Sequence, residues 1–248
     1  MHYEIHPSFY PPEDKNAKIW RYINFDHFQN MLKEESLYFS KATKFLDPYE
    51  GTLPEYNNSV RQTMYSPEQF SSTEQYERFI SNMPDVMKTV SKIEKENYIV
   101  NCWHLNEFES ASMWHMYSNV KAGIAIQSTY EKIRKSFKNP NKIIGVGKVR
   151  YLDFKKEWGN EAFTLDTFLI KRKSFLCDNE LRVISYLQDD ERDKDGKHIK
   201  IDLNTLIERI YIAPLSEPSF EEKVKSEVEQ TQSFLKDRIN KSDLYSLV

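Results

Sequence analysis

The chain has 248 residues, of which 39% are hydrophobic, 14% aromatic and 29% charged; it is too apolar for a disordered protein, and no run approaches the roughly 18 apolar residues of a membrane-spanning helix. Its 35 lysines and arginines against 38 aspartates and glutamates give a formal charge of −3, so contact with nucleic acid would need a local basic patch. Two cysteines, Cys102 and Cys177, cannot build a disulfide framework, and together with the lack of a targeting segment they predict a cytoplasmic protein with no membrane partner.

The first hundred residues predict a strand, a helix, a second strand, a turn and a helical insert. Residues 18–22 (KIWRY) are typical of a short strand, and Asn24 is a candidate N-cap for a helix with apolar residues at helical spacing. Residues 37–39 predict an aromatic strand, and residues 45–51 (FLDPYEG) predict a turn. The polar stretch 57–96 is expected to be a helical insert lying on the surface.

The rest of the chain predicts short strands separated by helices. Strands are expected at 98–103, 124–126, 143–152, 181–187 and 209–213. Helices are expected at 110–117, 129–137, 162–173 and 219–238. Asp195 and Gly196 predict a hairpin turn within the charged stretch 188–200, and residues 244–248 form either an edge strand or a loose tail.

These elements predict an α+β fold in a single domain spanning residues 1–248. Two aromatic strands on either side of one amphipathic helix favour a split sheet, mixed or antiparallel, with helices around it. Glycine occurs only six times, and the sequence holds no phosphate-binding loop, Rossmann fingerprint, zincin or serine-hydrolase motif. The absence of these motifs argues against a P-loop nucleoside triphosphatase, a Rossmann dehydrogenase, a zincin and a serine hydrolase.

Two polar residues stand in apolar surroundings in the first half of the chain. Arg21 lies between Trp20 and Tyr22, where its planar donor fork either holds a phosphate shielded by the rings or faces water from an edge strand. Ser40 follows an aromatic strand and either points into a cleft or simply ends that strand.

Glu180 opens the strand expected at 181–187 and shares one strand face with Arg182. A carboxylate in this position either orients a ribose hydroxyl and stabilises developing positive charge or forms a salt bridge with Arg182 within the strand. Both interpretations remain open at this point.

The remaining candidates have ordinary structural explanations beside the functional ones. Tyr117 and Trp114 share a helix face that either walls a cleft or packs into the core. His104 and His115 lack a third metal ligand at a recognised spacing. Residues 171–173 (KRK) suit the C-terminal end of a helix, or they join a basic patch for nucleic acid with Lys142, Lys148 and Arg150.

Five segments follow one another in an order that resembles a known bacterial family. They contain, in order, a basic residue between aromatics, a helix, an aromatic strand ending in serine, a D-P-Y-E turn, a W-x-x-Y helix and a late strand opening E-x-R. The five segments are residues 19–51, 101–127, 149–154, 168–186 and 207–214. This order resembles the family called domain of unknown function 2971. Leu46 departs from it, because the family turn usually has asparagine there.

The ordered trio of Arg21, Ser40 and Glu180 in turn resembles the R-S-E arrangement of ADP-ribosyltransferases. That resemblance implies an ADP-ribosyltransferase-like fold, with NAD as substrate. It implies that Arg21 contacts the NAD phosphates or ribose, that Ser40 supports the nicotinamide ribose and that Glu180 binds the 2′-hydroxyl of that ribose. Further residues expected at the NAD site, as aromatic walls or turn and hydroxyl groups, are Tyr22, Phe45, Asp47, Tyr49 and Tyr117.

The leading hypothesis is therefore an enzyme that moves ADP-ribose from NAD to a macromolecular acceptor, either a protein or a nucleic acid. Such an enzyme would serve as a bacterial toxin or anti-phage defence effector, with an antitoxin or defence-system protein as a possible partner. Two alternatives remain: a non-catalytic module that binds a nucleotide or peptide, and a metal-dependent nuclease. The nuclease would hold Mg²⁺ with four carboxylates, those of Asp47, Glu50, Asp178 and Glu180.

Overall fold

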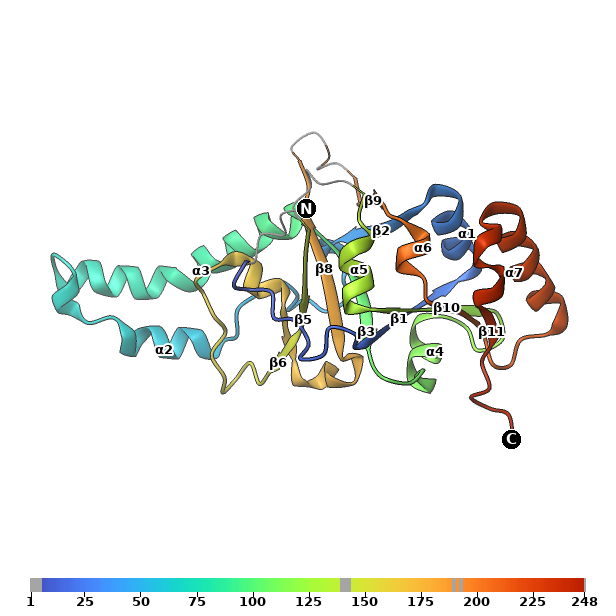
Figure 1. Ribbon diagram of the computed structural model, residues 1–248. Coiled ribbons are helices and arrows are strands. Elements are labelled where there is room, and N and C mark those ends of the chain that lie inside the picture. The colour runs from blue at the N-terminus through green and yellow to red at the C-terminus, as the bar shows by residue number, and fades with distance from the viewer. Residues whose placement is uncertain (1–5, 139–143, 189–190, 192–193, 248) are drawn as a thin grey trace.

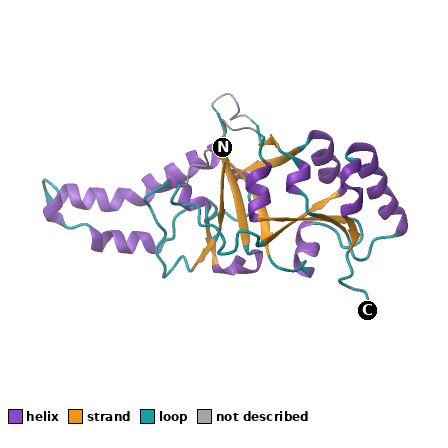
Figure 2. Ribbon diagram, viewed as in Figure 1, coloured by secondary structure: helices purple, strands orange, loops and turns teal. Residues whose placement is uncertain are grey.

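The computed structural model describes residues 6–138, 144–188, 191 and 194–247. These residues form an α+β fold around a nine-stranded sheet that is mixed and mostly antiparallel (Figures 1 and 2). The strands of the sheet are β1 (Lys18–Asn24), β2 (Ser36–Lys41), β3 (Tyr98–Leu105), β4 (Gly123–Thr129), β5 (Ile144–Lys148), β8 (Glu180–Tyr186), β9 (Gly196–Lys200), β10 (Arg209–Ile212) and β11 (Ile239–Lys241). The α-helices are α1 (Phe25–Glu34), α2 (Tyr56–Met64), α3 (Thr73–Asn97), α4 (Ala111–Tyr117), α5 (Tyr130–Ser136), α6 (Leu203–Leu206) and α7 (Pro218–Thr231). No described helix is long and apolar enough to cross a membrane.

The sheet separates along one edge of β3. Strand β8 pairs with β3 from Tyr98 to His104, on the edge of β3 opposite the separation. On the separated edge, β1 joins β3 only through Ile19–Leu105 and Trp20–His104, whereas β2 joins the opposite end through two further residue pairs. The two strands therefore diverge beside the middle of β3, and the side chains near this separation are free to line a cavity.

Alternation along β1 explains how one strand serves two hydrophobic clusters. Ile19 and Ile23 enter the main core, while Trp20 and Tyr22 pack in a second cluster against α4. Helix α1 follows directly because Asn24 accepts a hydrogen bond from the His27 N–H as its N-cap. The predicted strands at 18–22, 37–39, 98–103, 124–126, 181–187 and 209–213 and the helices after Asn24 and at 110–117 and 129–137 are confirmed.

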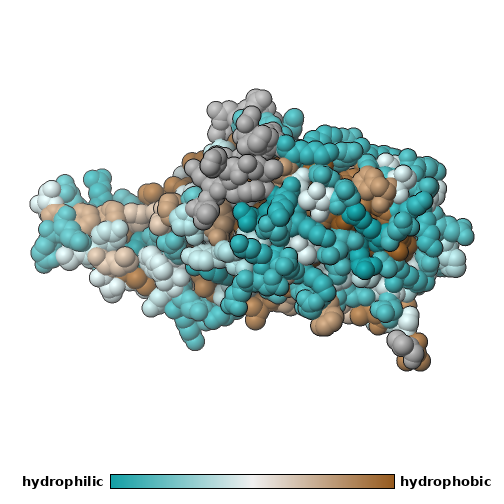
Figure 3. Space-filling view, viewed as in Figure 1, coloured by the Kyte–Doolittle hydropathy of each residue, from teal (hydrophilic) through white to brown (hydrophobic). Residues whose placement is uncertain are grey.

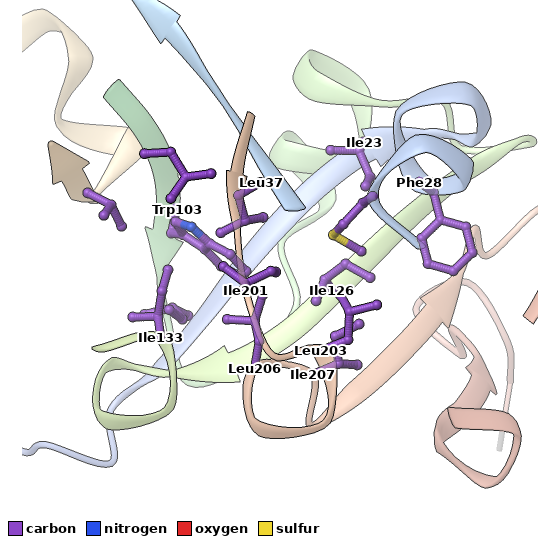
Figure 4. Packing of buried hydrophobic residues seen from close by; sticks show 14 of the residues in the cluster. Ile23, Phe28, Leu37, Trp103, Ile126, Ile133, Ile201, Leu203, Leu206 and Ile207 are labelled. Atoms are coloured by element: carbon purple, nitrogen blue, oxygen red, sulfur yellow. The ribbon is translucent and has the colours of Figure 1, made fainter. Parts of the chain in front are cut away.

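The main core lies between the sheet and helices α1, α5, α6 and α7. Figure 4 labels core side chains from the sheet, α1, α5 and α6, and Val224 and Val228 of α7 belong to the same cluster. Phe28 of α1, Leu37 of β2 and Trp103 of β3 are almost completely buried there. The Trp103 indole also donates to the Asn101 side chain at 2.7 Å, which satisfies its polar group inside the core.

Residues 56–97 form a helical projection away from the sheet (Figure 1). It contains α2, the 3₁₀ helix η2 (Pro67–Gln69) and the 25-residue α3, which begins at the N-cap Ser72 and continues through Pro84. The face seen in Figure 3 mixes hydrophobic and hydrophilic side chains along this projection. The base is fixed by a buried ion pair, Arg61–Glu161 at 2.5 Å.

Two predictions in the second half are wrong. Residues 162–173 are not one helix but a 3₁₀ helix, η3 (Thr164–Phe168), followed by strand β7 (Ile170–Arg172). Three consecutive residues, Phe168 to Ile170, are buried, which a half-exposed helix cannot achieve. The strand expected at 143–152 is divided, because β5 pairs with β8 whereas β6 (Arg150–Leu152) pairs in parallel with β7 in a separate small sheet; Ile143 lies outside the described residues.

Two further predictions in the last quarter of the chain need correction, and one alternative for the C-terminal residues is ruled out. Strand β9 pairs with β2 rather than β8, so Asp195 and Gly196 do not close a hairpin; part of the charged stretch lies outside the described residues. The helix expected at 219–238 breaks at Gln232, whose side chain donates to the Leu32 carbonyl, and continues as the 3₁₀ helix η6 (Ser233–Arg238). Of the two alternatives for residues 244–248, the edge strand is wrong for the described residues 244–247, and β11 lies at that edge of the sheet.

Candidate functional site

A cavity of about 330 Å³ lies beside the separation of β1 and β3. It is close to the lower end of the volumes typical of small-molecule sites, about 300–1,000 Å³. Its wall combines aromatic rings with charged side chains from four strands, two α-helices and the segments that connect them. The lining includes Arg21 and Tyr22 of β1, His104 of β3, Tyr117 of α4, Lys171 of β7, Glu180 and Arg182 of β8, and Phe45, Glu50 and Asp178 from connecting segments.

Arg182 is the centre of a buried charge network on one side of this cavity. Its side chain is 1% exposed, and its terminal nitrogens donate to both Glu50 oxygens at 2.7 and 2.8 Å. Its Nε donates to Glu180 Oε2 at 2.7 Å, and Nη1 also donates to the Phe168 carbonyl. The guanidinium therefore joins β8 to the turn at 45–51 and fixes the Glu180 carboxylate.

Lys171 completes the network from β7. Its ammonium donates to Glu180 Oε1 at 2.6 Å and to Asp178 Oδ2 at 2.7 Å, and Glu50 Oε1 lies 3.8 Å away. Three carboxylates, those of Glu50, Asp178 and Glu180, thus face two cations. Each Glu180 oxygen already accepts one hydrogen bond, and a carboxylate oxygen has a second lone pair for a ligand donor.

The network keeps Glu180 ionised. Burial favours the neutral acid and is the largest single influence, but Arg182 and Lys171 together outweigh it and lower the pKa of Glu180 to about 2. The same carboxylates raise the pKa of Lys171 and of Arg182, despite their burial. The cavity therefore presents a permanent negative charge held in a fixed position at neutral pH.

Arg21 stands apart from this network. Its Nη1 donates to the Cys102 carbonyl at 2.7 Å, which ties the guanidinium to the free edge of β3. Among the residues that the structure describes, no carboxylate pairs with it. Burial lowers the pKa of Arg21, but an arginine still remains protonated at physiological pH. Its remaining N–H donors are thus available to an anionic ligand.

His104 carries a second unsatisfied group. Its Nδ1 contacts the Asp178 carbonyl oxygen at 2.7 Å, so Nδ1 carries a proton and donates this hydrogen bond. Nε2 is buried and has no hydrogen-bond partner within the described part of the chain. The imidazole stands directly opposite Glu180 in the β3–β8 register.

Five of the residues expected at the site line this cavity: Arg21, Tyr22, Phe45, Tyr117 and Glu180. The Phe45 ring lies 5.5 Å from the Arg182 guanidinium and packs against a third hydrophobic cluster, which includes Val100 and Phe168. Burial, with the nearby Asp178 and Glu180 charges, raises the pKa of Tyr117 to about 12. Tyr117 is half exposed at the mouth, and its phenol stays protonated as a possible donor.

Three expected residues do not line the cavity. Ser40 lies within β2, opposite Val100 and Gly196. Asp47 pairs with Arg172 at 2.8 Å, and the Arg172 guanidinium lies 4.3 Å from the Tyr49 ring. Asp47 and Tyr49 therefore fix the turn near the site.

The sequence interpretation missed the role of Lys171 and gave no role to Nε2 of His104. Residues 171–173 were expected to close a helix, but Lys171 and Arg172 end β7 and Lys173 begins the following 3₁₀ helix, and each cation has an acidic partner. The position of Lys171 nine residues before Glu180 carries no recognisable signal, because the contact depends on how β7 folds back toward β8. The salt bridge between Arg182 and Glu180 within the strand, one of the two readings of Glu180, is present.

The nuclease arrangement lacks a common carboxylate site. Asp47 binds Arg172, whereas Glu50, Asp178 and Glu180 form ion pairs with Lys171 and Arg182. Within the described ranges no group of three or more His, Cys, Asp or Glu side chains is arranged to hold a metal ion. The positions where a cation would lie are taken by the lysine and arginine head groups.

No protein-family model matches the sequence, and a search of curated proteins finds no significant match. The cavity and its charged side chains are therefore the features that indicate a function.

Proposed function

We propose that this protein is an NAD-dependent ADP-ribosyltransferase with an ADP-ribosyltransferase-like split sheet, and that the cavity binds the nicotinamide end of NAD. The observation that carries the proposal is that Arg21 and Glu180, from two strands far apart in sequence, line one cavity. One supplies a cation without an acidic partner among the described residues, and the other supplies a carboxylate held ionised. A ligand such as NAD needs the cation to bind its phosphates and the carboxylate to stabilise positive charge on its reacting sugar.

The binding step follows from the chemistry of Arg21. A guanidinium presents a planar fork of N–H donors that matches two oxygens of a phosphate group. Because Nη1 is already tied to the Cys102 carbonyl, the fork is held in place before the ligand arrives. The Tyr22 and Phe45 rings offer apolar walls for the nicotinamide ring beside it.

The chemical step needs a fixed negative charge. The bond between nicotinamide nitrogen and ribose C1′ breaks, and its electron pair leaves with nicotinamide, which becomes neutral. The ribose then carries developing positive charge, as in glycoside cleavage. In this proposal Glu180, which lines the same cavity, stabilises that charge electrostatically. A lone pair of the acceptor forms the new bond to C1′, and the acceptor loses its proton.

Ser40 has no part in the proposed reaction, because it lies in β2 away from the cavity lining. The acceptor is proposed to be a protein or a nucleic acid. We also propose membership of the family called domain of unknown function 2971 and a role as a toxin or defence effector, on the sequence resemblance alone.

The first test measures nicotinamide released from NAD by purified protein with bacterial lysate as the source of acceptor. Arg21→Gln should reduce release by at least about 100-fold, the scale of losing one preorganised electrostatic group. Because Arg21 pairs with no described carboxylate, the substitution does not leave a buried carboxylate without its ion-pair partner. Arg209→Gln, at an exposed arginine of β10, is the matched control and should retain full activity.

The second variant, Glu180→Gln, keeps the size of the side chain and removes its charge. It should abolish release, provided that unfolding measurements show a folded protein, since it also weakens contacts with Lys171 and Arg182. If wild-type protein binds NAD but releases no nicotinamide with any lysate fraction, the transferase proposal is wrong and a nucleotide-binding module replaces it. Full activity in Glu180→Gln would remove Glu180 from the mechanism.

A further inference from the structure

A second cavity, of about 240 Å³, adjoins the first at the separation of the strands. Its walls come from α1, β2 and β9, whereas the first cavity lies against β3, β7 and β8. The two cavities share three lining residues: Arg21, Ile23 and His27. Arg21 is thus a wall of both, at the point where β1 and β2 diverge from β3.

The second cavity differs from the first in charge. Among the described residues its lining includes no carboxylate, and Arg21 is the only permanent cation there. Such a lining suits an anion and does not compete for the arginine with an acid of its own. By contrast, the first cavity holds the buried carboxylates of Glu50, Asp178 and Glu180.

Polar and aromatic groups line the second cavity together. The Tyr38 and His198 rings lie 5.1 Å apart and tilted by 54°, across the β2–β9 pairing. Ser36 Oγ contacts His198 Nδ1 at 2.9 Å and holds that imidazole in position. Asn30, on α1, adds a solvent-exposed amide with two donors and one acceptor oxygen. Rings and an amide are groups that bind a flat heterocyclic base and its sugar.

We propose that this second cavity binds the adenosine monophosphate half of a dinucleotide whose linking phosphates lie against Arg21. The inference rests on the proposed function, because it assigns the nicotinamide half to the cavity that holds Glu180. Only that orientation brings the reacting ribose to the carboxylate, and the other nucleoside must then continue past Arg21. The first cavity, at 330 Å³, is near the lower end of the range for small-molecule sites. A ligand as large as a dinucleotide is therefore expected to occupy the adjoining cavity as well.

The experiment compares three probes by calorimetry on the full chain: NAD, AMP and nicotinamide mononucleotide. The variants are Asn30→Ala and His198→Ala, on two separate elements, so that one informs if the other fails to fold. Lys200→Ala is the matched control, since it is an exposed residue of β9 outside both cavities. Thermal unfolding of each variant checks that the fold is retained.

Each cavity variant should weaken NAD and AMP about tenfold, the effect expected from one lost hydrogen bond or ring contact. Binding of nicotinamide mononucleotide, which reaches only the first cavity and Arg21, should be unchanged. Equal weakening of all three probes, unchanged NAD binding in both variants, or wild-type protein that binds neither NAD nor AMP would overturn the inference. If the variants weaken NAD and AMP binding as expected but the wild-type protein never releases nicotinamide, the second cavity is an adenosine monophosphate site and the proposed transferase activity is wrong.

Discussion

Arg182 binds Glu50 through both of its terminal nitrogens, at 2.7 and 2.8 Å, across 132 residues of sequence. Both side chains are almost fully buried. Removing one partner of such a pair leaves the other charge buried and unpaired, which costs about 3–5 kcal/mol. We therefore expect Arg182→Ala to lower the free energy of unfolding by about that amount in chemical denaturation.

Arg209→Ala, at an exposed arginine on β10, serves as the control and should change stability by less than about 0.5 kcal/mol. A loss below about 1 kcal/mol in Arg182→Ala would mean that the charge network adds little to the fold.

Stability should depend on pH through Glu180. Its pKa is about 2 in the folded protein against an ordinary value of 4.5, so the folded state binds its proton less readily than the unfolded state does. The stabilising contribution is complete above about pH 4.5 and is lost as the pH falls through 2. Denaturation curves measured from pH 6 to pH 2 should show this decline, and Glu180→Gln should show a shallower one. An identical acid dependence in both proteins would contradict the assignment.

Asp47 should matter for stability although it lies outside the cavity. Its side chain is 5% exposed, pairs with Arg172 at 2.8 Å and accepts the Tyr49 N–H. Asp47→Ala leaves these donors unsatisfied and should lower the free energy of unfolding by about 1–3 kcal/mol. Asp237→Ala, at an exposed aspartate, is the control; equal stability of the two variants would leave Asp47 without a structural role.

Gly51 should not tolerate a side chain. Its φ of +64° belongs to the left-handed region, and a Cβ atom there would lie 2.7 Å from Cε1 of the buried Phe168. Gly51→Ala should therefore cost about 1–3 kcal/mol of stability. Since Gly51 follows Glu50, the strain should also disturb the contact with Arg182. Gly159→Ala isolates the effect of φ, because a Cβ there would also lie close to a side chain, 2.6 Å from Pro54 Cδ, but Gly159 is not among the positive-φ residues. A thermal midpoint for Gly51→Ala equal to that of wild type would refute this expectation.

Local patterns were sufficient for most of the elements near the site. Alternating aromatic and apolar residues predicted β1, β2 and β8, and Asn24 marked the start of α1, because these signals depend only on neighbours in the sequence. The same alternation placed Glu180 and Arg182 on one face, where they do pair. Such local rules failed at 162–173, where burial of consecutive residues against the sheet replaced the expected helix with η3 and β7.

The sequence by itself determined an α+β chain with two aromatic strands, a helix between them and candidate charges at Arg21 and Glu180. Only the tertiary structure decided which charges meet. Glu50 and Lys171 reach the Glu180–Arg182 pair from distant segments, whereas Ser40 stays within β2 away from the cavity. Strand pairing across more than a hundred residues sets these distances, and no local pattern records the pairing. The cavity, and the unpaired state of Arg21 among the described residues, are properties of the assembled sheet.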